Sequence, residues 1–188
     1  SGCVGVGGVY LGFKKSGAAI VQYRKALELA QKQKSTTQIT ELNTKISNAF
    51  EVEGNIIQAE QFLNLAKTNV KAQSPKEEAI QSQRAAEFYS RNRNIDKEVE
   101  QRKQTLKNLE ESDLDEVVSE DVVLNKPKAK LDLGNALLKQ NNFGEAIPIL
   151  EESADEAEKT NDILTLKDAV QRLSEAYASL GDDNKALS

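Results

Sequence analysis

The chain has 188 residues, of which 38% are hydrophobic and 29% are charged, and its formal net charge at pH 7 is -5. This length suits one ordinary domain or a short repeat array, and the composition is that of a folded helical protein rather than a disordered one. An acidic chain with both signs mixed along it lacks the basic face that general nucleic-acid binding requires. No apolar run approaches the roughly 20 residues of a membrane-spanning helix.

Residue types that carry catalysis and metal binding are scarce. The sequence has no His and one Cys, so it lacks the commonest metal ligand and the usual general base, and it has no pair of thiols for a disulfide. No Walker loop is present, and the glycines of GVGGVYLG fail the dinucleotide spacing. The acidic run from Glu110 to Glu116 lacks the alternate ligands of a calcium loop. We therefore expect no enzyme activity, no cofactor and no metal site.

The first segment, Ser1–Phe13, is rich in glycine, which disfavours a helix by about 1 kcal/mol per residue relative to Ala. Residues 1–16 are expected to form either an irregular arm or a degenerate first helix. Cys3 follows Ser1 and Gly2 as at the end of a bacterial lipoprotein cleavage site, so a surface-anchored lipoprotein is one alternative. A regular helical pattern starts at Gly17 and continues to about Lys34.

Helical spacing of apolar residues then predicts a pair of helices, from about Ile39 to Glu53 and from Asn55 to about Gln73, separated by a stop at Gly54. A third pair begins at Pro75. The second helix of that pair is irregular, because it carries charged or polar residues where Ala and a large apolar residue are expected: Glu98, Arg102 and Thr105. We expect it to be longer, shifted in register or partly exposed.

An insertion follows, Glu111–Pro127, whose residues Val117, Val118, Val122, Val123 and Leu124 are expected to form a short helix or an apolar flap. The regular pattern returns in Leu131–Ala157, where Asn141 and Asn142 separate two helices. A last unit starts near Thr165, with a turn predicted at Gly181–Asp183 and a second helix at Ala186. Because that helix ends after two residues of its apolar face, we expect the repeat domain, residues 17–188, to be truncated within its last unit.

The clearest pair carries Leu133, Gly134 and Leu137 on one helix and Ala146, Leu150 and Ala154 on the next. This order of small and large residues resembles the tetratricopeptide repeat (TPR). The glycine position recurs as Gly7, Ser47, Ala86, Gly134 and Ser174, at separations of 40, 39, 48 and 40 residues. The resemblance implies an all-α, right-handed solenoid of about four helix–turn–helix units with a period near 40, similar to the N-terminal repeat region of bacterial sensor kinases and related regulators.

In this family the residue that follows the small residue at the glycine position points into a concave groove. The resemblance therefore implies groove positions at Asn48, Glu87, Asn135 and Glu175, with Gly8 in the first unit. The two asparagines resemble those that hold a peptide backbone or terminal carboxylate, a role that also needs basic neighbours. Lys128 and Lys139 supply them around Asn135, whereas Glu41, Thr44 and Glu51 occupy the corresponding positions around Asn48, so a carboxylate clamp is broken in one repeat.

The function implied by the resemblance is a protein-interaction scaffold of a bacterial signalling or regulatory protein. It would bind a partner's peptide or helix, or an adjoining domain of its own chain, in the groove. One alternative is a ligand-sensing input domain, which an enclosed pocket lined by the third unit and Val117–Leu124 would favour. The sequence leaves the compartment open.

Overall fold

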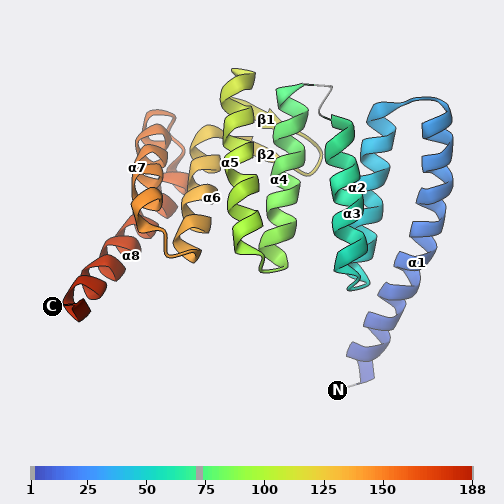
Figure 1. Ribbon diagram of the computed structural model, residues 1–188, viewed down its shortest axis with the longest axis horizontal. Helices are drawn as coiled ribbons and strands as arrows, with labels where there is room; N and C mark the ends of the chain where they lie inside the picture. The colour runs from blue at the N-terminus through green and yellow to red at the C-terminus, as the bar shows by residue number, and fades with distance from the viewer. Residues whose placement is uncertain (1–2, 71–73, 188) are drawn as a thin grey trace. The chain divides into compact units, whose positions relative to one another are not determined.

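The structure is a computed structural model that describes the backbone of residues 3–70 and 74–187 and the side chains of residues 15–69 and 74–181. Within these ranges the chain forms eight helices and one two-stranded β-hairpin (Figure 1). Two compact units divide it, unit 1 (Ser1–Ser74) and unit 2 (Pro75–Ser188). The fold class is an all-α helical repeat solenoid, as the sequence predicts.

Unit 1 consists of α1 (Cys3–Lys32), α2 (Thr36–Val52) and α3 (Ile56–Val70). The two sides of α2 pack against α1 and α3. Ile46 and Ala59 are fully buried between α2 and α3, and the Ser47 hydroxyl donates a hydrogen bond to the Ala59 carbonyl at 2.7 Å. The rings of Phe50 and Phe62 stack with centroids 5.6 Å apart, so small and aromatic residues together close this pair.

The start of unit 1 is helical, which agrees with the first-helix alternative and not with the irregular arm. It is continuous with the helical segment predicted from Gly17, and together they form α1, a single helix of 30 residues. Helical conformation costs glycine only about 1 kcal/mol per residue, and no Pro interrupts the segment. The side chains before residue 15 lie outside the described residues, so the expectations for Gly7, Tyr10 and Cys3 are not addressed.

Unit 2 begins with the antiparallel pair α4 (Pro75–Arg91) and α5 (Ile95–Ser112). The hairpin of β1 (Glu116–Val118) and β2 (Val123–Asn125) follows, with Val117 opposite Leu124. The chain continues through α6 (Lys126–Lys139), α7 (Phe143–Lys159) and α8 (Ile163–Leu187), and each of these helices packs on the next.

Four helix–helix turns share one local design. In each, a residue with positive φ is followed by an Asn or Asp whose side chain caps the next helix; the pairs are Gly54–Asn55, Arg93–Asn94, Asn141–Asn142 and Asn161–Asp162. A left-handed residue ends one helix and a side-chain oxygen satisfies an unpaired N–H of the next. The stops predicted at Gly54 and at Asn141–Asn142 are confirmed.

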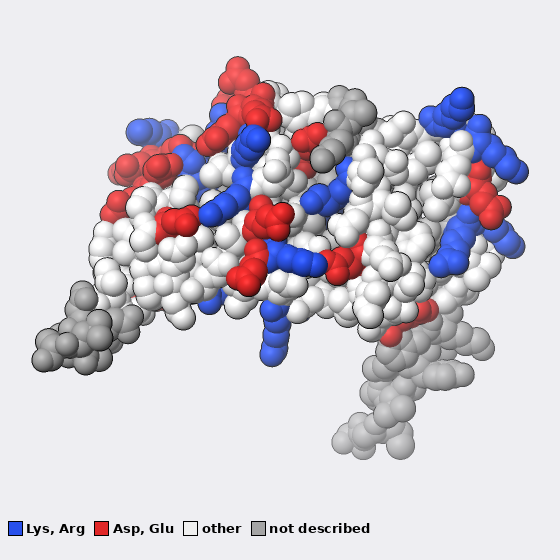
Figure 2. All heavy atoms as spheres, viewed as in Figure 1, with Lys and Arg blue, Asp and Glu red and all other residues white. Residues whose placement is uncertain are grey.

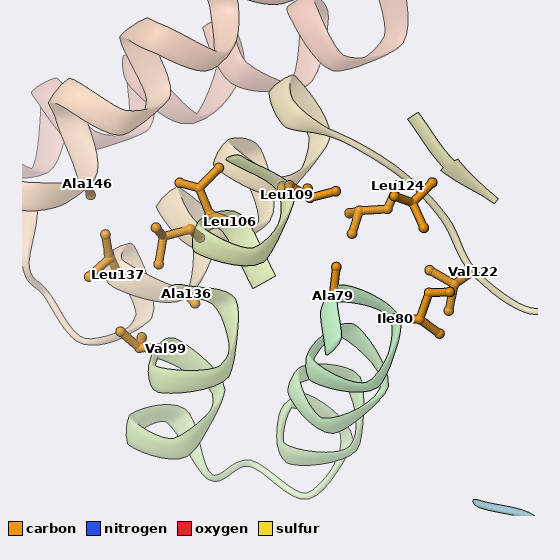
Figure 3. Packing of buried hydrophobic residues seen from close by; sticks show 13 residues of the cluster. Ala79, Ile80, Val99, Leu106, Leu109, Val122, Leu124, Ala136, Leu137 and Ala146 are labelled. Carbon is orange, nitrogen blue, oxygen red and sulfur yellow. The ribbon is translucent and has the colours of Figure 1, made fainter. Parts of the chain in front are cut away.

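The hairpin occupies the predicted insertion, but the short helix expected there does not form. Successive β-branched residues favour a strand, and the alternation of β1 and β2 buries Val117 and Leu124 while Val118 and Val123 remain exposed. Val117, Val122 and Leu124 join the main core of unit 2, where they meet α4, α5 and α6 (Figure 3). The apolar side of the hairpin is thus part of the core.

The end of the chain also differs from expectation. The turn predicted at Gly181–Asp183 is absent, and α8 is a single helix of 25 residues that continues to Leu187. An ideal Cβ at Gly181 meets nothing within 4 Å. The predicted Ala186 helix is therefore the last turn of α8.

The irregular helix of the third pair packs in the regular position. Glu98, Arg102 and Thr105 are only 3%, 8% and 1% exposed, so the helix is not partly exposed. Charged residues thus occupy the packing face of α5, where Glu98 and Arg102 pair with each other and with groups on α4 and α6.

Candidate functional site

A cleft of about 310 Å³ lies between α6, the turn to α7, and α8. We call it the α6–α8 cleft. Its lining consists of Asn135, Leu138, Lys139, Asn141, Phe143, Arg172, Glu175, Ala176 and Ser179. Three residues that the sequence predicts for the groove, Asn135, Lys139 and Glu175, therefore line one site. Leu138, Phe143 and Ala176 give it an apolar part between these polar groups.

Asn135 has an unusual environment among these residues. Its side chain is half-buried, and its Oδ1 atom is buried without a hydrogen-bond partner among the described residues. An unpaired buried acceptor costs about 1–3 kcal/mol. Because the amide torsion of Asn is broad, a rotation about χ2 can bring Oδ1 to the cleft. Asn135 is therefore suited to accept a hydrogen bond from a molecule in the cleft.

The charged residues of the cleft are already paired. Lys139 Nζ lies 3.1 Å from Glu98 Oε2 and donates to Ser90 Oγ at 3.3 Å. Arg172 Nη1 donates to Glu175 Oε2 at 2.8 Å. The pKa of Glu175 is lowered, first by this hydrogen bond and then by one from Gln171. The cleft thus offers polar groups of balanced charge and no unpaired cation for a carboxylate.

A buried polar network lies beside the cleft. Arg102 Nη1 on α5 donates to Gln83 Oε1 on α4 at 3.1 Å. The Arg102 guanidinium also lies 3.5 Å from Glu98 Oε1 and 3.5 Å from Asp132 Oδ2 on α6. Since Glu98 also binds Lys139, the network connects the packing of α4, α5 and α6 to the wall of the cleft.

Two other predicted groove residues belong to this network rather than to the cleft. Glu87 accepts a hydrogen bond from Gln83 Nε2 at 2.9 Å, and Lys128 Nζ lies 3.6 Å from Asp132 Oδ2. The last predicted residue, Asn48, is exposed on α2 in unit 1. The two lysines expected beside Asn135 are therefore not both available in the cleft. Lys128 does not line the cleft, and Lys139 lines it but is paired with Glu98.

Arg172 and Phe143 are part of the site but are not predicted from the sequence. Arg172 precedes the groove position Glu175 by three residues, so it shares a helix face with that carboxylate. Phe143 is the first residue of α7, directly after the turn. Its position at the cleft depends on the fold of that turn, which the sequence pattern does not give. The unusual residues Glu98 and Arg102 were the one signal in the sequence for the adjoining network.

The enclosed pocket that would favour ligand sensing does not form around the hairpin. Val117, Val122 and Leu124 are at most 3% exposed, and they pack against Ala79, Ile80 and Leu109. Their side chains fill the core rather than line a cavity.

Among the residues that the structure describes, no three His, Cys, Asp or Glu side chains are grouped to hold a metal ion. The described helices also include none that is long and apolar enough to span a membrane.

Antiparallel helix pairs with small residues at their contacts define a TPR-like helical-repeat fold. No protein family model matches the sequence, and no curated protein sequence matches it. Solved structures do match. A kinesin light chain-like protein of Podosopora anserina with nearly identical TPR-like repeats has a TM-score of 0.67 at 15% identity, over 93% of this chain and 83% of that chain. BtubC (BKLC) from P. vanneervenii has a TM-score of 0.65 at 17% identity, over 95% of this chain and 69% of that chain. At these identities the similarity concerns the fold.

Proposed function

We propose that the chain is a protein-interaction module that holds a peptide segment of a partner protein, or of an adjoining domain, in the α6–α8 cleft. The observation that carries the proposal is the unpaired Oδ1 of Asn135 beside an apolar surface. A peptide N–H supplies the missing donor, and an apolar side chain of the peptide packs on Leu138 and Phe143.

The balanced charges of the cleft favour an internal peptide segment over a free C-terminal carboxylate. Lys139 and Arg172 are each bound to a carboxylate of this chain, Glu98 and Glu175 respectively. A terminal carboxylate would have to displace one of these ion pairs, whereas a backbone N–H displaces none. The role of the module in a bacterial sensor kinase or related regulator, which the sequence resemblance implies, is part of this proposal.

A peptide-display selection against the folded chain tests the proposal. Ser179→Trp fills the cleft from an exposed position on α8, and Ala178→Trp adds the same bulk at an exposed residue outside the cleft. We expect selected peptides to lose binding to Ser179→Trp and to bind Ala178→Trp normally. Asn135→Ala should weaken binding by about tenfold, because one hydrogen bond to the peptide is lost.

Selected peptides that bind wild type, Ser179→Trp and Asn135→Ala equally would place the interaction elsewhere and refute the cleft as its site. Asn48→Ala serves as the matched control for the amide, because Asn48 occupies the same repeat position in unit 1 and is exposed.

A further inference from the structure

The last helix carries an exposed apolar stripe. Ile163, Val170 and Tyr177 recur every seven residues along α8 and are 73%, 53% and 51% exposed. Leu166 and Leu173 lie between them and are half-buried. A seven-residue spacing keeps apolar residues on one side of a helix and is the pattern that packs against a second helix. We call this surface the α8 stripe.

The repeat itself indicates what covers such a surface. Leu133 and Leu137 of α6 are 4% and 1% exposed because neighbouring helices cover them: they belong to a core cluster with residues of α5 and with Ala146 of α7. The equivalent residues of α8 are Leu173, which is half-buried, and Tyr177, which is 51% exposed. The α8 stripe is therefore shaped for a helix, as the corresponding face of α6 is.

Acidic residues border the stripe. The Tyr177 hydroxyl donates to Glu151 Oε1 on α7 at 2.7 Å, which places this face of α7 next to the stripe. Asp155 and Glu158 follow Glu151 at spacings of four and seven residues, so they share that face. Both are exposed and form no ion pair within the described residues. A helix that covers the stripe is therefore favoured if it carries basic residues along one side.

The outer face of α1 has this combination. Val21 and Leu29 are 52% and 60% exposed, and Ala18, Lys25 and Lys32 are exposed on the same face. Neither lysine forms an ion pair within the described part of the chain. We call this surface the α1 face. Lys25 lies between Val21 and Leu29 on this face. The exposed Glu28 lies at its edge, so the face combines apolar contacts with a net positive charge.

The net charges of the two units are also opposite in sign: unit 1, which contains the α1 face, is positive, and unit 2, which contains the α8 stripe, is negative. Unit 1 contains nine Lys and Arg against five Asp and Glu, a net charge of +4, and unit 2 contains 16 against 25, a net charge of -9. In Figure 2, Lys and Arg gather over α1, and Asp and Glu gather over α7 and the end of α5. Opposite potentials of this kind steer association and suppress contacts between like surfaces.

We propose that the α8 stripe of one molecule binds the α1 face of a second copy. The apolar residues of the two helices pack together, and Lys25 and Lys32 lie against the acidic border on α7. A contact between two different surfaces of the same chain is heterologous. The assembly therefore keeps one free α1 face at one end and one free α8 stripe at the other, and further copies can add. An α8-to-α8 contact would bring the acidic border no equivalent of Lys25 and Lys32, because the described side chains of α8 include a single exposed lysine, Lys167, beside the stripe.

Sedimentation velocity of the whole chain tests the proposal. We expect wild type to associate as its concentration rises, and higher ionic strength to weaken this association because it screens the charges. Leu29→Glu and Val170→Glu each place a carboxylate in one of the two surfaces, and each variant alone should associate at least about tenfold more weakly. Ile57→Glu on α3 changes an apolar residue that is 74% exposed outside both surfaces, and it should associate like wild type.

The decisive measurement is a mixture of the two impaired variants. Leu29→Glu retains its α8 stripe and Val170→Glu retains its α1 face, so the mixture should form dimers that do not grow further. Circular dichroism establishes that each variant is folded. Wild type that remains monomeric overturns the proposal. So does a Leu29→Glu chain that associates like wild type, or a mixture of folded variants that forms no dimer.

Discussion

Gly134 lies where α6 and α7 are in close contact, and the structure predicts the effect of adding one methyl group there. An ideal Cβ at Gly134 would lie 2.5 Å from both Cγ and Cδ2 of Leu150, which is fully buried. Ordinary contact begins near 3.4 Å, so the Leu150 side chain or one of the helices must shift by about 1 Å. Such overpacking costs about 1–3 kcal/mol, while helix propensity favours Ala over Gly by about 1 kcal/mol. Gly134→Ala should therefore lower the free energy of unfolding by up to about 2 kcal/mol.

A double-mutant cycle separates the two effects. Leu150→Ala removes both contacting atoms and by itself should cost about 2–5 kcal/mol. In that background the clash is gone and only the propensity remains, so Gly134→Ala should raise the free energy of unfolding by about 1 kcal/mol. Urea unfolding followed by circular dichroism measures all four proteins. If Gly134→Ala has the same effect with Leu150 and with Ala at position 150, the close approach is not what requires glycine.

Three further predictions concern the end of the chain, the hairpin and the buried network. Gly181→Ala should raise helicity and stabilise by up to about 1 kcal/mol, because α8 continues through an exposed glycine; a loss of helicity would indicate a turn there. Hydrogen bonds from Arg84 hold the pKa of Asp121 below its usual 3.8, so their stabilisation is present above about pH 4 and is lost as the pH falls through the folded-state value. NMR shifts of the hairpin should report this loss, and Arg84→Ala should remove it. Arg102→Ala should cost about 1–3 kcal/mol in thermal or urea unfolding, because the buried Gln83 Oε1 loses its donor while Glu98 keeps Lys139. A smaller cost for Arg102→Leu combined with Gln83→Leu would show that the unpaired acceptor is responsible.

Much of the fold follows from local sequence signals. The turns at Gly54 and at Asn141–Asn142 were predicted because residues that tolerate positive φ and residues that cap helices are recognisable from their side chains alone. The same reasoning was wrong at Gly181, where a turn was predicted and α8 continues as a helix. A glycine ends a helix only where the chain must turn, and this requirement depends on what packs against the next segment.

The repeat pattern predicts which residues share the α6–α8 cleft, while their role in binding stays a prediction. Asn135 and Glu175 occupy the same position in adjacent repeats, so their meeting across one cleft follows from the period. The pairing of charges does not follow from the period. Lys139 binds Glu98, which is 41 residues distant in the chain, and only the packing of α5 against α6 brings the two together.

Positions that depart from the repeat pattern indicate where a residue serves something other than packing. A buried ion network is weak evidence for stability, because apolar residues of similar volume often replace such networks without loss. Glu98 and Arg102 stand where the pattern has Ala and a large apolar residue, and they hold Lys139 at the wall of the α6–α8 cleft. Local exceptions to a consistent pattern are expected at functional sites. The polar face of α5 is thus better explained by the charge balance it gives the cleft than by the packing of the core.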